Sequence, residues 1–259
     1  MRKILVIFIF KILTYPILLI LKLNKGYLDL LSPIWSQNLE SLIYILRQNT
    51  KPENNNFRSH QDLINKSRLQ NFEDLSFLFN SNYSNRGIVA LDFDEAAHIF
   101  STIRKNKFEN LLEIGRFLGG STLLITVAKK ISSKFISVDL KIKSPAYADD
   151  KVIFEVIKKI DPANVNLIIS NSSNYIPPFN LDFVFIDGDH SYAGVKNDYL
   201  NIKKYLNNDA HLLFHDAVAP RNYTTIHQPV YDFMQELNND KNLIHIADVG
   251  SIRHFIFKK

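Results

Sequence analysis

The sequence predicts an α/β protein built on a doubly wound parallel sheet that an antiparallel hairpin closes. Strand-like and helical segments alternate from residue 110 onward, and only a short turn separates the last two strand-like segments. Acidic residues also end several of the strand-like segments, at the edge where open α/β sheets bind ligands. These three observations predict the fold class and the edge of the sheet that carries a site.

Five strand-like runs are expected to lie parallel, because helical stretches near 120–130, 150–160 and 191–206 separate them and right-handed crossovers join such strands. The runs are NLLEIG (110–115), FISVD (135–139), VNLIIS (165–170), DFVFID (182–187) and AHLLFH (210–215). LIHIA (243–247), the turn DVGS and IRHFIF (252–257) form the predicted hairpin.

A helical accessory region or lid is predicted over residues 27–90, ahead of a sheet domain over 91–259. Apolar residues follow helical spacing around Leu39, Leu42, Ile43 and Leu46, and the polar segment NTKPENNNFRSHQD then indicates a loop or linker. Further helices are expected over 60–80 and 92–105, the second after a cap at Asp92 to Asp94.

Residues 4–21 form an apolar stretch that is a candidate membrane anchor. Apolar side chains surround this segment on all sides, and its length is near the lower limit for crossing a bilayer. We expect residues 1–26 to be a signal-anchor or a hairpin kinked at Pro16, so that a membrane-associated protein holds its sheet domain in the cytoplasm. A buried amino-terminal helix in a cytoplasmic protein is the alternative.

The basic charge is concentrated in those first 26 residues, which hold five of the 31 basic side chains and no acidic one. The rest of the chain is therefore neutral, which argues against nucleic-acid binding because that function needs a basic patch on the folded domain. The chain has no cysteine, so disulfides, thiolate metal sites and cysteine nucleophiles are excluded.

The segment from Leu181 to Tyr199, LDFVFIDGDHSYAGVKNDY, is the most informative part of the sequence. A strand ends at Asp187, Gly188 relaxes the backbone, and Asp189 with His190 open a polar helix. Carboxylates and an imidazole at the end of a buried strand can hold a metal or move a proton. The alternative is that Asp187 and Asp189 only cap the helix over 190–206.

A glycine-containing turn, LLEIGRFLGGST (111–122), indicates a nucleotide-like cofactor. Its three glycines allow a ligand to approach the backbone, and Ser121 with Thr122 can cap the next helix. Asp139 ends the second strand, where it can accept hydrogen bonds from ribose hydroxyls. The spacing is not GxGxxG, which disfavours a dinucleotide oxidoreductase.

EIGRFLGGST, Asp139, FIDGDHSYAGVKND and LLFHDA together resemble the class I S-adenosylmethionine-dependent methyltransferases, in particular the small-molecule O-methyltransferase branch with FIDGDHSY-type motifs. The resemblance covers about residues 85–257 and implies a Rossmann-like seven-stranded sheet. It also implies a cofactor site. The methionine part of S-adenosylmethionine would contact Glu113, Gly115, Gly119 and Ser121. The ribose would contact Asp139, and the adenine would contact Asn171 and Ser172.

The resemblance further implies that Asp187 and Asp216 hold a divalent cation such as Mg²⁺, beside a third oxygen ligand. Here His215 or Ala217 stands where that ligand is expected, which favours testing Mn²⁺ as well. His190 is placed as the general base.

Some polar residues near this site keep open or structural assignments. Asp189 is left as a ligand, as an orienting partner of His190 or as a helix cap. For His215, a packed and hydrogen-bonded histidine is preferred to a metal ligand. The remaining histidines, His98, His211, His227, His245 and His254, are taken as structural or exposed.

These expectations describe a membrane-associated O-methyltransferase whose acceptor is a hydroxyl of a small molecule, a sugar or a lipid-linked saccharide. A non-catalytic module that binds and tethers at the membrane, or another reaction on the same scaffold, are the rival functions. Self-association into a homo-oligomer stays open.

Overall fold

The computed structural model describes residues 69–79, 89–140, 148–218 and 228–259. The predicted membrane anchor, His227 and most of the predicted accessory region lie outside these residues. No helix in the described part of the chain is long and apolar enough to cross a membrane.

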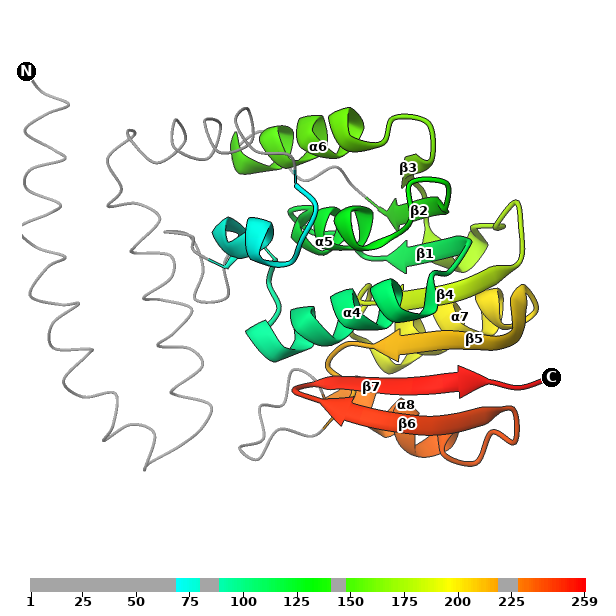
Figure 1. Cartoon of the computed structure of the whole chain (residues 1–259). Coiled ribbons are helices and arrows are strands. Elements are labelled where there is room, and N and C mark those ends of the chain that lie inside the picture. Colours follow the sequence, from blue (N-terminus) through cyan, green and yellow to red (C-terminus); the bar gives the residue numbers. More distant parts are fainter. Residues whose placement is uncertain (1–68, 80–88, 141–147, 219–227) are drawn as a thin grey trace, which may run out of the picture. The chain divides into compact units, whose positions relative to one another are not determined.

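A seven-stranded mixed sheet forms the centre of the described structure, with the order β3-β2-β1-β4-β5-β7-β6 (Figure 1). The first five strands are parallel, whereas β7 runs antiparallel to both β5 and β6, as the sequence predicts. The strands are β1 (Asn110–Ile114), β2 (Lys134–Asp139), β3 (Val165–Ile169), β4 (Leu181–Ile186), β5 (Leu206–Phe214), β6 (Leu243–Val249) and β7 (Ile252–Phe257).

Helices cover both faces of the sheet, because successive strand residues point to opposite faces and both sets are apolar. Leu111 of β1 packs in one buried cluster with side chains of α4, α5 and α6, whereas its neighbour Leu112 packs in a second cluster with α7 and α8. Figure 1 shows α7 and α8 on the far side of the sheet from α4 and α5. The helices are α4 (Phe93–Asn106), α5 (Gly120–Ala128), α6 (Ala148–Ile160), α7 (Tyr192–Lys203) and α8 (Gln228–Leu237).

The helix predicted over 60–80 is much shorter within its described part. Only Glu73–Leu78 is helical there, as the 3₁₀ helix η1. Asp74 accepts hydrogen bonds from the backbone N–H groups of Gln70 and Asn71, both at 2.8 Å, and so stabilises a non-helical turn just before it. Leu75 and Leu78 pack into the same buried cluster as α4 to α6, so this part of the accessory region shares the core of the sheet domain.

Helix α8 was absent from the sequence-based prediction. Its apolar residues Val230, Phe233, Met234 and Leu237 follow helical spacing and are all buried against the sheet. This helical spacing of apolar residues is the signal in the sequence that could have predicted α8.

Three of the histidines taken as structural form one hydrogen-bonded chain from α4 through β7 to β5. His98 Nε2 lies 3.0 Å from His254 Nδ1, and His254 Nε2 lies 2.8 Å from His211 Nδ1. Burial and, to a smaller extent, the neighbouring histidines together lower the pKa of His254 to about 3. The three hydrogen-bonded histidines are therefore a neutral structural element at physiological pH.

Acid should destabilise the fold between about pH 6.5 and pH 3, because the unfolded chain binds a proton in this range that buried His254 refuses. Its contribution is present above pH 6.5 and is lost at up to about 1.4 kcal/mol per pH unit below it. Urea unfolding at several pH values should show a shallower decline for His254→Gln than for the wild type. His245→Gln, at an exposed histidine on β6, is the control; equal slopes in all three proteins would contradict the assignment.

Candidate active site

Strand register brings the site residues together at the carboxyl edge of the sheet. Ile186 of β4 pairs with Ile114 of β1 and with Phe214 of β5, and the hydrogen-bond pattern continues one residue further. The N–H of Asp187 donates to the Ile114 carbonyl at 2.8 Å, and the N–H of His215 donates to the Ile186 carbonyl at 3.0 Å. Asp187 and His215 consequently lie on adjacent strands at the same level.

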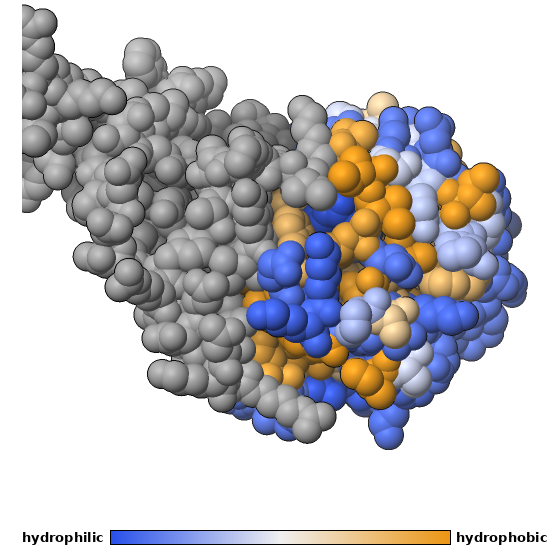
Figure 2. All heavy atoms as spheres, turned by 90° about the horizontal axis from the view of Figure 1, so that it is seen from above, coloured by the Kyte–Doolittle hydropathy of each residue, from blue (hydrophilic) through white to orange (hydrophobic). Residues whose placement is uncertain are grey.

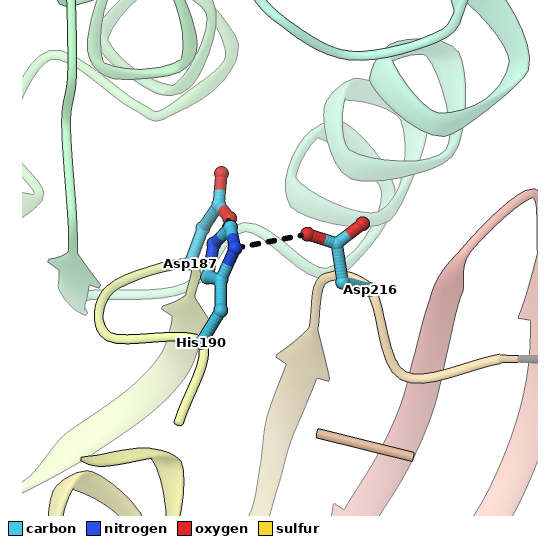
Figure 3. A group of neighbouring side chains, drawn as sticks. All are labelled: Asp187, His190 and Asp216. Atoms are coloured by element: carbon cyan, nitrogen blue, oxygen red, sulfur yellow. Dashed lines mark hydrogen bonds and ion pairs between the residues drawn. The ribbon is translucent and has the colours of Figure 1, made fainter. Parts of the chain in front are cut away.

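Asp187, His190 and Asp216 form a compact group, the Asp-His-Asp cluster, in which one ligand atom from each lies within 4.8 Å of the others. His190 Nε2 is 3.3 Å from Asp187 Oδ1, and His190 Nδ1 is 3.5 Å from Asp216 Oδ2. Figure 3 shows the imidazole beside the Asp187 carboxylate and facing Asp216 across the gap between β4 and β5. The His190 side chain is 40% exposed, so the cluster can be reached from solvent.

Asp216 adopts a left-handed backbone conformation, with φ at 55°, directly after β5. Such a conformation is uncommon for residues other than glycine, and it needs support from the surroundings. Its N–H donates to Ser251 Oγ at 3.3 Å, and the next two N–H groups donate to the Ser251 carbonyl. The turn between β6 and β7 thus holds the segment that carries Asp216.

His215 is buried between three carboxylates. Its Nδ1 lies 3.0 Å from Asp187 Oδ1 and 3.4 Å from Asp216 Oδ2, while its Nε2 lies 3.4 Å from Glu95 Oε2 on α4. Sequence reasoning placed Glu95 only within the start of a helix. Its side chain does accept the N–H of Asp92 at 2.8 Å, as in a capping box, but it also reaches His215.

Opposite charges dominate the electrostatics of these side chains. Burial alone would lower the pKa of His215, but the charge of Asp187 and hydrogen bonds to the surrounding carboxylates raise it well above its usual value. Burial would raise the pKa of Asp187, yet His215 and His190 bring it below the usual range. The hydrogen bond to Asp187 raises the pKa of His190.

Asp189 has a local structural contact. Its Oδ1 accepts the N–H of Ser191 at 2.9 Å, and Ser191 is the residue that caps α7 by accepting the N–H of Gly194. The helix therefore begins at Tyr192 with Ser191 as its cap, rather than with Asp187 or Asp189.

On the cofactor side, Glu113 is fully buried and joined to Ser121. Its two carboxylate oxygens accept the hydroxyls of Ser121 and Thr122 at 2.6 Å each and that of Ser137 at 2.5 Å. Burial raises the pKa of Glu113 to about 7 against the opposing effect of these hydroxyls and of Arg116. The contact of Glu113 and Ser121 with a methionine group stays a prediction, because both side chains are buried and hydrogen-bonded to each other.

Asp139 closes the glycine turn from the neighbouring strand. Its Oδ2 accepts the N–H of Arg116 at 2.9 Å and that of Phe117 at 3.2 Å. The guanidinium of Arg116 is buried beneath the turn, where it donates to the carbonyls of Ser137 and Ile168 at 2.6 and 2.8 Å. Sequence reasoning missed Arg116, because a charged residue in a turn is normally exposed.

The predicted adenine loop lies at the end of β3 and includes the 3₁₀ helix η2 (Ser172–Asn174). Asn171 is exposed and its side chain accepts the N–H of Ser173 at 3.0 Å, while the carbonyl of Ser172 accepts the Asn201 side chain at 2.8 Å. Figure 2 shows hydrophobic residues reaching the described surface between hydrophilic ones. Leu140 and Ile169, exposed at the ends of β2 and β3, are apolar side chains on the predicted cofactor edge.

Gly115 lies between the predicted cofactor side of the site and the Asp-His-Asp cluster. Its replacement by alanine should disrupt both. Its φ is 85°, and an added Cβ would lie 2.0 Å from the backbone oxygen of Asp187. Since β1 and β4 cannot separate without breaking the sheet, we expect the variant to lose about 3 kcal/mol of stability or more. Denaturant unfolding measures this loss. Gly194→Ala is unsuitable as a control, because a Cβ at this half-buried residue would strike Asp189. Ala193→Gly, at an exposed position of α7, serves instead, and equal stability of Gly115→Ala and the wild type would refute the prediction.

Comparison with known families shows what this part of the chain is similar to. A family model described as a methyltransferase domain matches residues 112–217, from β1 to the residue after Asp216. Over these residues the chain is similar to a methyltransferase domain. The matched range includes Asp139 and the whole Asp-His-Asp cluster, whereas Glu95 and Ser251 lie outside it.

The chain is 33% identical over 135 residues to the uncharacterized protein R132 of Acanthamoeba polyphaga mimivirus. That match covers 49% of this chain and 59% of the relative, so the chain spans less than two thirds of the relative's length.

Solved methyltransferases share the fold at low sequence identity. Methyltransferase PaMTH1 of Podospora anserina, solved with bound S-adenosylhomocysteine, has a TM-score of 0.56 and 16% identity over 78% of this chain and 94% of that one. The O-methyltransferase TomG of Streptomyces achromogenes, in complex with S-adenosylmethionine, has a TM-score of 0.51 and 14% identity, covering 66% and 82%. A methyltransferase of Geobacter sulfurreducens gives 0.52 and 14%, covering 79% and 97%. The described part of the chain thus has the predicted Rossmann-like fold, which these methyltransferases share.

Proposed function

We propose that the protein transfers a methyl group from S-adenosylmethionine to a hydroxyl of a small molecule, a sugar or a lipid-linked saccharide. The observation that carries this proposal is the Asp-His-Asp cluster, where a partly exposed imidazole contacts two carboxylates at the sheet edge that also holds the glycine turn. Methyl transfer to a hydroxyl needs a base at such a position, because the acceptor oxygen must lose its proton.

His190 would take that proton. When Asp187 accepts the Nε2 proton of His190, the Nδ1 atom carries the lone pair, and the acceptor proton passes to Nδ1 as the oxygen bonds to the methyl carbon. S-adenosylmethionine, when bound, supplies the methyl group and leaves as S-adenosylhomocysteine. Asp139 and the turn at Gly115 would orient the donor, and holding both reactants in line would supply much of the acceleration.

A divalent cation fits the donor set of the Asp-His-Asp cluster. The carboxylates of Asp187 and Asp216 would hold the ion, and His190 beside them would act as the base. Because a histidine, His215, stands where a third oxygen ligand is expected, Mn²⁺ is tested beside Mg²⁺. A bound cation would supply positive charge that makes the acceptor hydroxyl more acidic.

The membrane association and the cytoplasmic side remain part of the proposal. They rest on the apolar residues 4–21 of the sequence, and a cytoplasmic site agrees with a cytosolic methyl donor. Fractionation of the full chain and of a chain lacking residues 1–26 tests this, and recovery of the full chain wholly in the soluble fraction would reject it.

Two measurements in sequence test the methyltransferase proposal. Calorimetry should first show binding of S-adenosylmethionine to the full chain; its absence would reject the cofactor assignment. A panel of hydroxylated sugars and small molecules, assayed with and without Mn²⁺, should then show transfer of labelled methyl to one class. Cofactor binding without transfer to any acceptor would favour the rival, a non-catalytic binding module at the membrane.

A further inference from the structure

Glu95 is the one carboxylate around His215 that does not belong to the Asp-His-Asp cluster, and the reaction described above does not use it. Its side chain is fully inaccessible to solvent, at 0% exposure. It lies on α4, before the range that matches the methyltransferase family model. A buried carboxylate is costly unless it is paired and hydrogen-bonded, so its contacts indicate what it is there to do.

One set of contacts leads from Glu95 to Asp187. Glu95 Oε2 is 3.4 Å from His215 Nε2, and Nδ1 on the opposite side of the same ring is 3.0 Å from Asp187 Oδ1. His215 Nε2 is buried and has no partner of full hydrogen-bond geometry within the described structure. The Glu95 carboxylate therefore compensates the positive charge on this side of the imidazole, and it fixes the plane of the ring.

A second set of contacts leads from Glu95 to Asp216. Glu95 Oε1 accepts both the N–H and the hydroxyl of Ser251, at 2.7 and 2.8 Å. Ser251 in turn receives the N–H of Asp216 on its Oγ. The left-handed conformation of Asp216 is thus supported by a residue that Glu95 holds in place.

The turn at Gly250 provides the room for this arrangement. Its φ is 59°, and a Cβ at this position would lie 2.6 Å from the Glu95 side chain. The glycine thus allows the β6–β7 turn to close directly over the carboxylate.

We propose that Glu95 is the positioning residue of the Asp-His-Asp cluster, which it holds at both ends: at Asp187 through His215 and at Asp216 through Ser251. The inference rests on the proposed function in taking this cluster as the acceptor and cation site. Glu95 does not touch the reacting groups itself. Losing it should loosen the cluster while the cofactor edge, formed by Gly115 and Asp139, stays intact.

The test compares full-length Glu95→Gln with the wild type. Glutamine keeps the volume and one acceptor oxygen for Ser251. It presents an N–H group where the second oxygen accepted the N–H of Asp92 and faced His215. Glu155→Gln, at an exposed glutamate on α6, is the matched control. Ser251→Ala removes only the hydroxyl that joins Glu95 to the N–H of Asp216 and keeps the Ser251 N–H that donates to Glu95. Three quantities are measured: the Asp187 Oδ1 to His215 Nδ1 distance in crystal structures, the Mn²⁺ affinity without cofactor, and the S-adenosylmethionine affinity by calorimetry.

We expect Glu95→Gln to lengthen the Asp187–His215 contact and to weaken Mn²⁺ binding by roughly 10- to 100-fold, with unchanged S-adenosylmethionine affinity. Ser251→Ala should weaken Mn²⁺ binding less, and Glu155→Gln not at all. A retained contact together with wild-type Mn²⁺ affinity overturns the inference, and so does an equal loss of Mn²⁺ and cofactor binding, which indicates a general structural role.

Failure of the proposed function gives a different result. If the wild type binds no Mn²⁺, the cation part of that function is rejected, and the crystal structures decide on Glu95 alone. A lost Asp187–His215 contact in Glu95→Gln then supports positioning, and a retained contact overturns it.

Discussion

Replacing His190 with alanine should lower the rate of methyl transfer by roughly 10² to 10⁴. The variant lacks the only imidazole of the described residues that is both partly exposed and within 3.5 Å of Asp187 and Asp216. S-adenosylmethionine affinity should not change, because the glycine turn and Asp139 lie on other strands. Single-turnover transfer of labelled methyl to the acceptor found in the panel measures the rate.

His245→Ala is the control for the His190 variant. His245 is an exposed histidine on β6 that contacts Asp248, so it matches the chemistry without belonging to the cluster. A His190→Ala rate close to that of the His245 variant would exclude His190 as the base. A parallel loss of cofactor binding would instead indicate a disturbed fold.

Replacing Asp139 with alanine should weaken S-adenosylmethionine binding by roughly 10- to 100-fold, which corresponds to about 1.4–2.8 kcal/mol. The carboxylate is expected to accept ribose hydroxyls, and it also holds the N–H groups of Arg116 and Phe117 in the glycine turn. Calorimetry on both proteins at one ionic strength gives the two dissociation constants.

Asp139→Asn separates these two contributions. The amide oxygen can still accept the two turn N–H groups, whereas the charge available to a ribose is gone. We expect an intermediate affinity. Wild-type affinity in both variants would remove Asp139 from the cofactor site.

The sequence predicted most of the sheet because its strands are short apolar runs separated by clear helical or polar segments. The same reasoning placed Asp187 and Asp216 at one edge, since parallel strands end together and β4 neighbours β5. The backbone register then puts Asp187 next to Gly115, a proximity that follows from strand order and not from any local motif.

Glu95 and Arg116 could not be found in this way. Glu95 meets His215 across 120 residues of chain, and its place in a capping box already accounts for an acid there. Arg116 is buried because backbone carbonyls of β2 and β3 happen to converge beneath the turn, which no pattern of residue types reveals. Helix α8 is different: its apolar spacing is visible in the sequence and was overlooked.

The β6–β7 turn precedes the last strand, and α4, which carries Glu95, lies before the first strand. Ser251 of the turn nevertheless contacts both Glu95 and Asp216. In evolutionary terms, recombination cannot transfer the whole site as one continuous segment of sequence. A chimera that receives only residues 112–217 from this protein would inherit every side chain of the Asp-His-Asp cluster without the groups that hold them. Related chains that exchange their amino-terminal helices would therefore have to exchange the hairpin turn with them, or lose the geometry of the cluster.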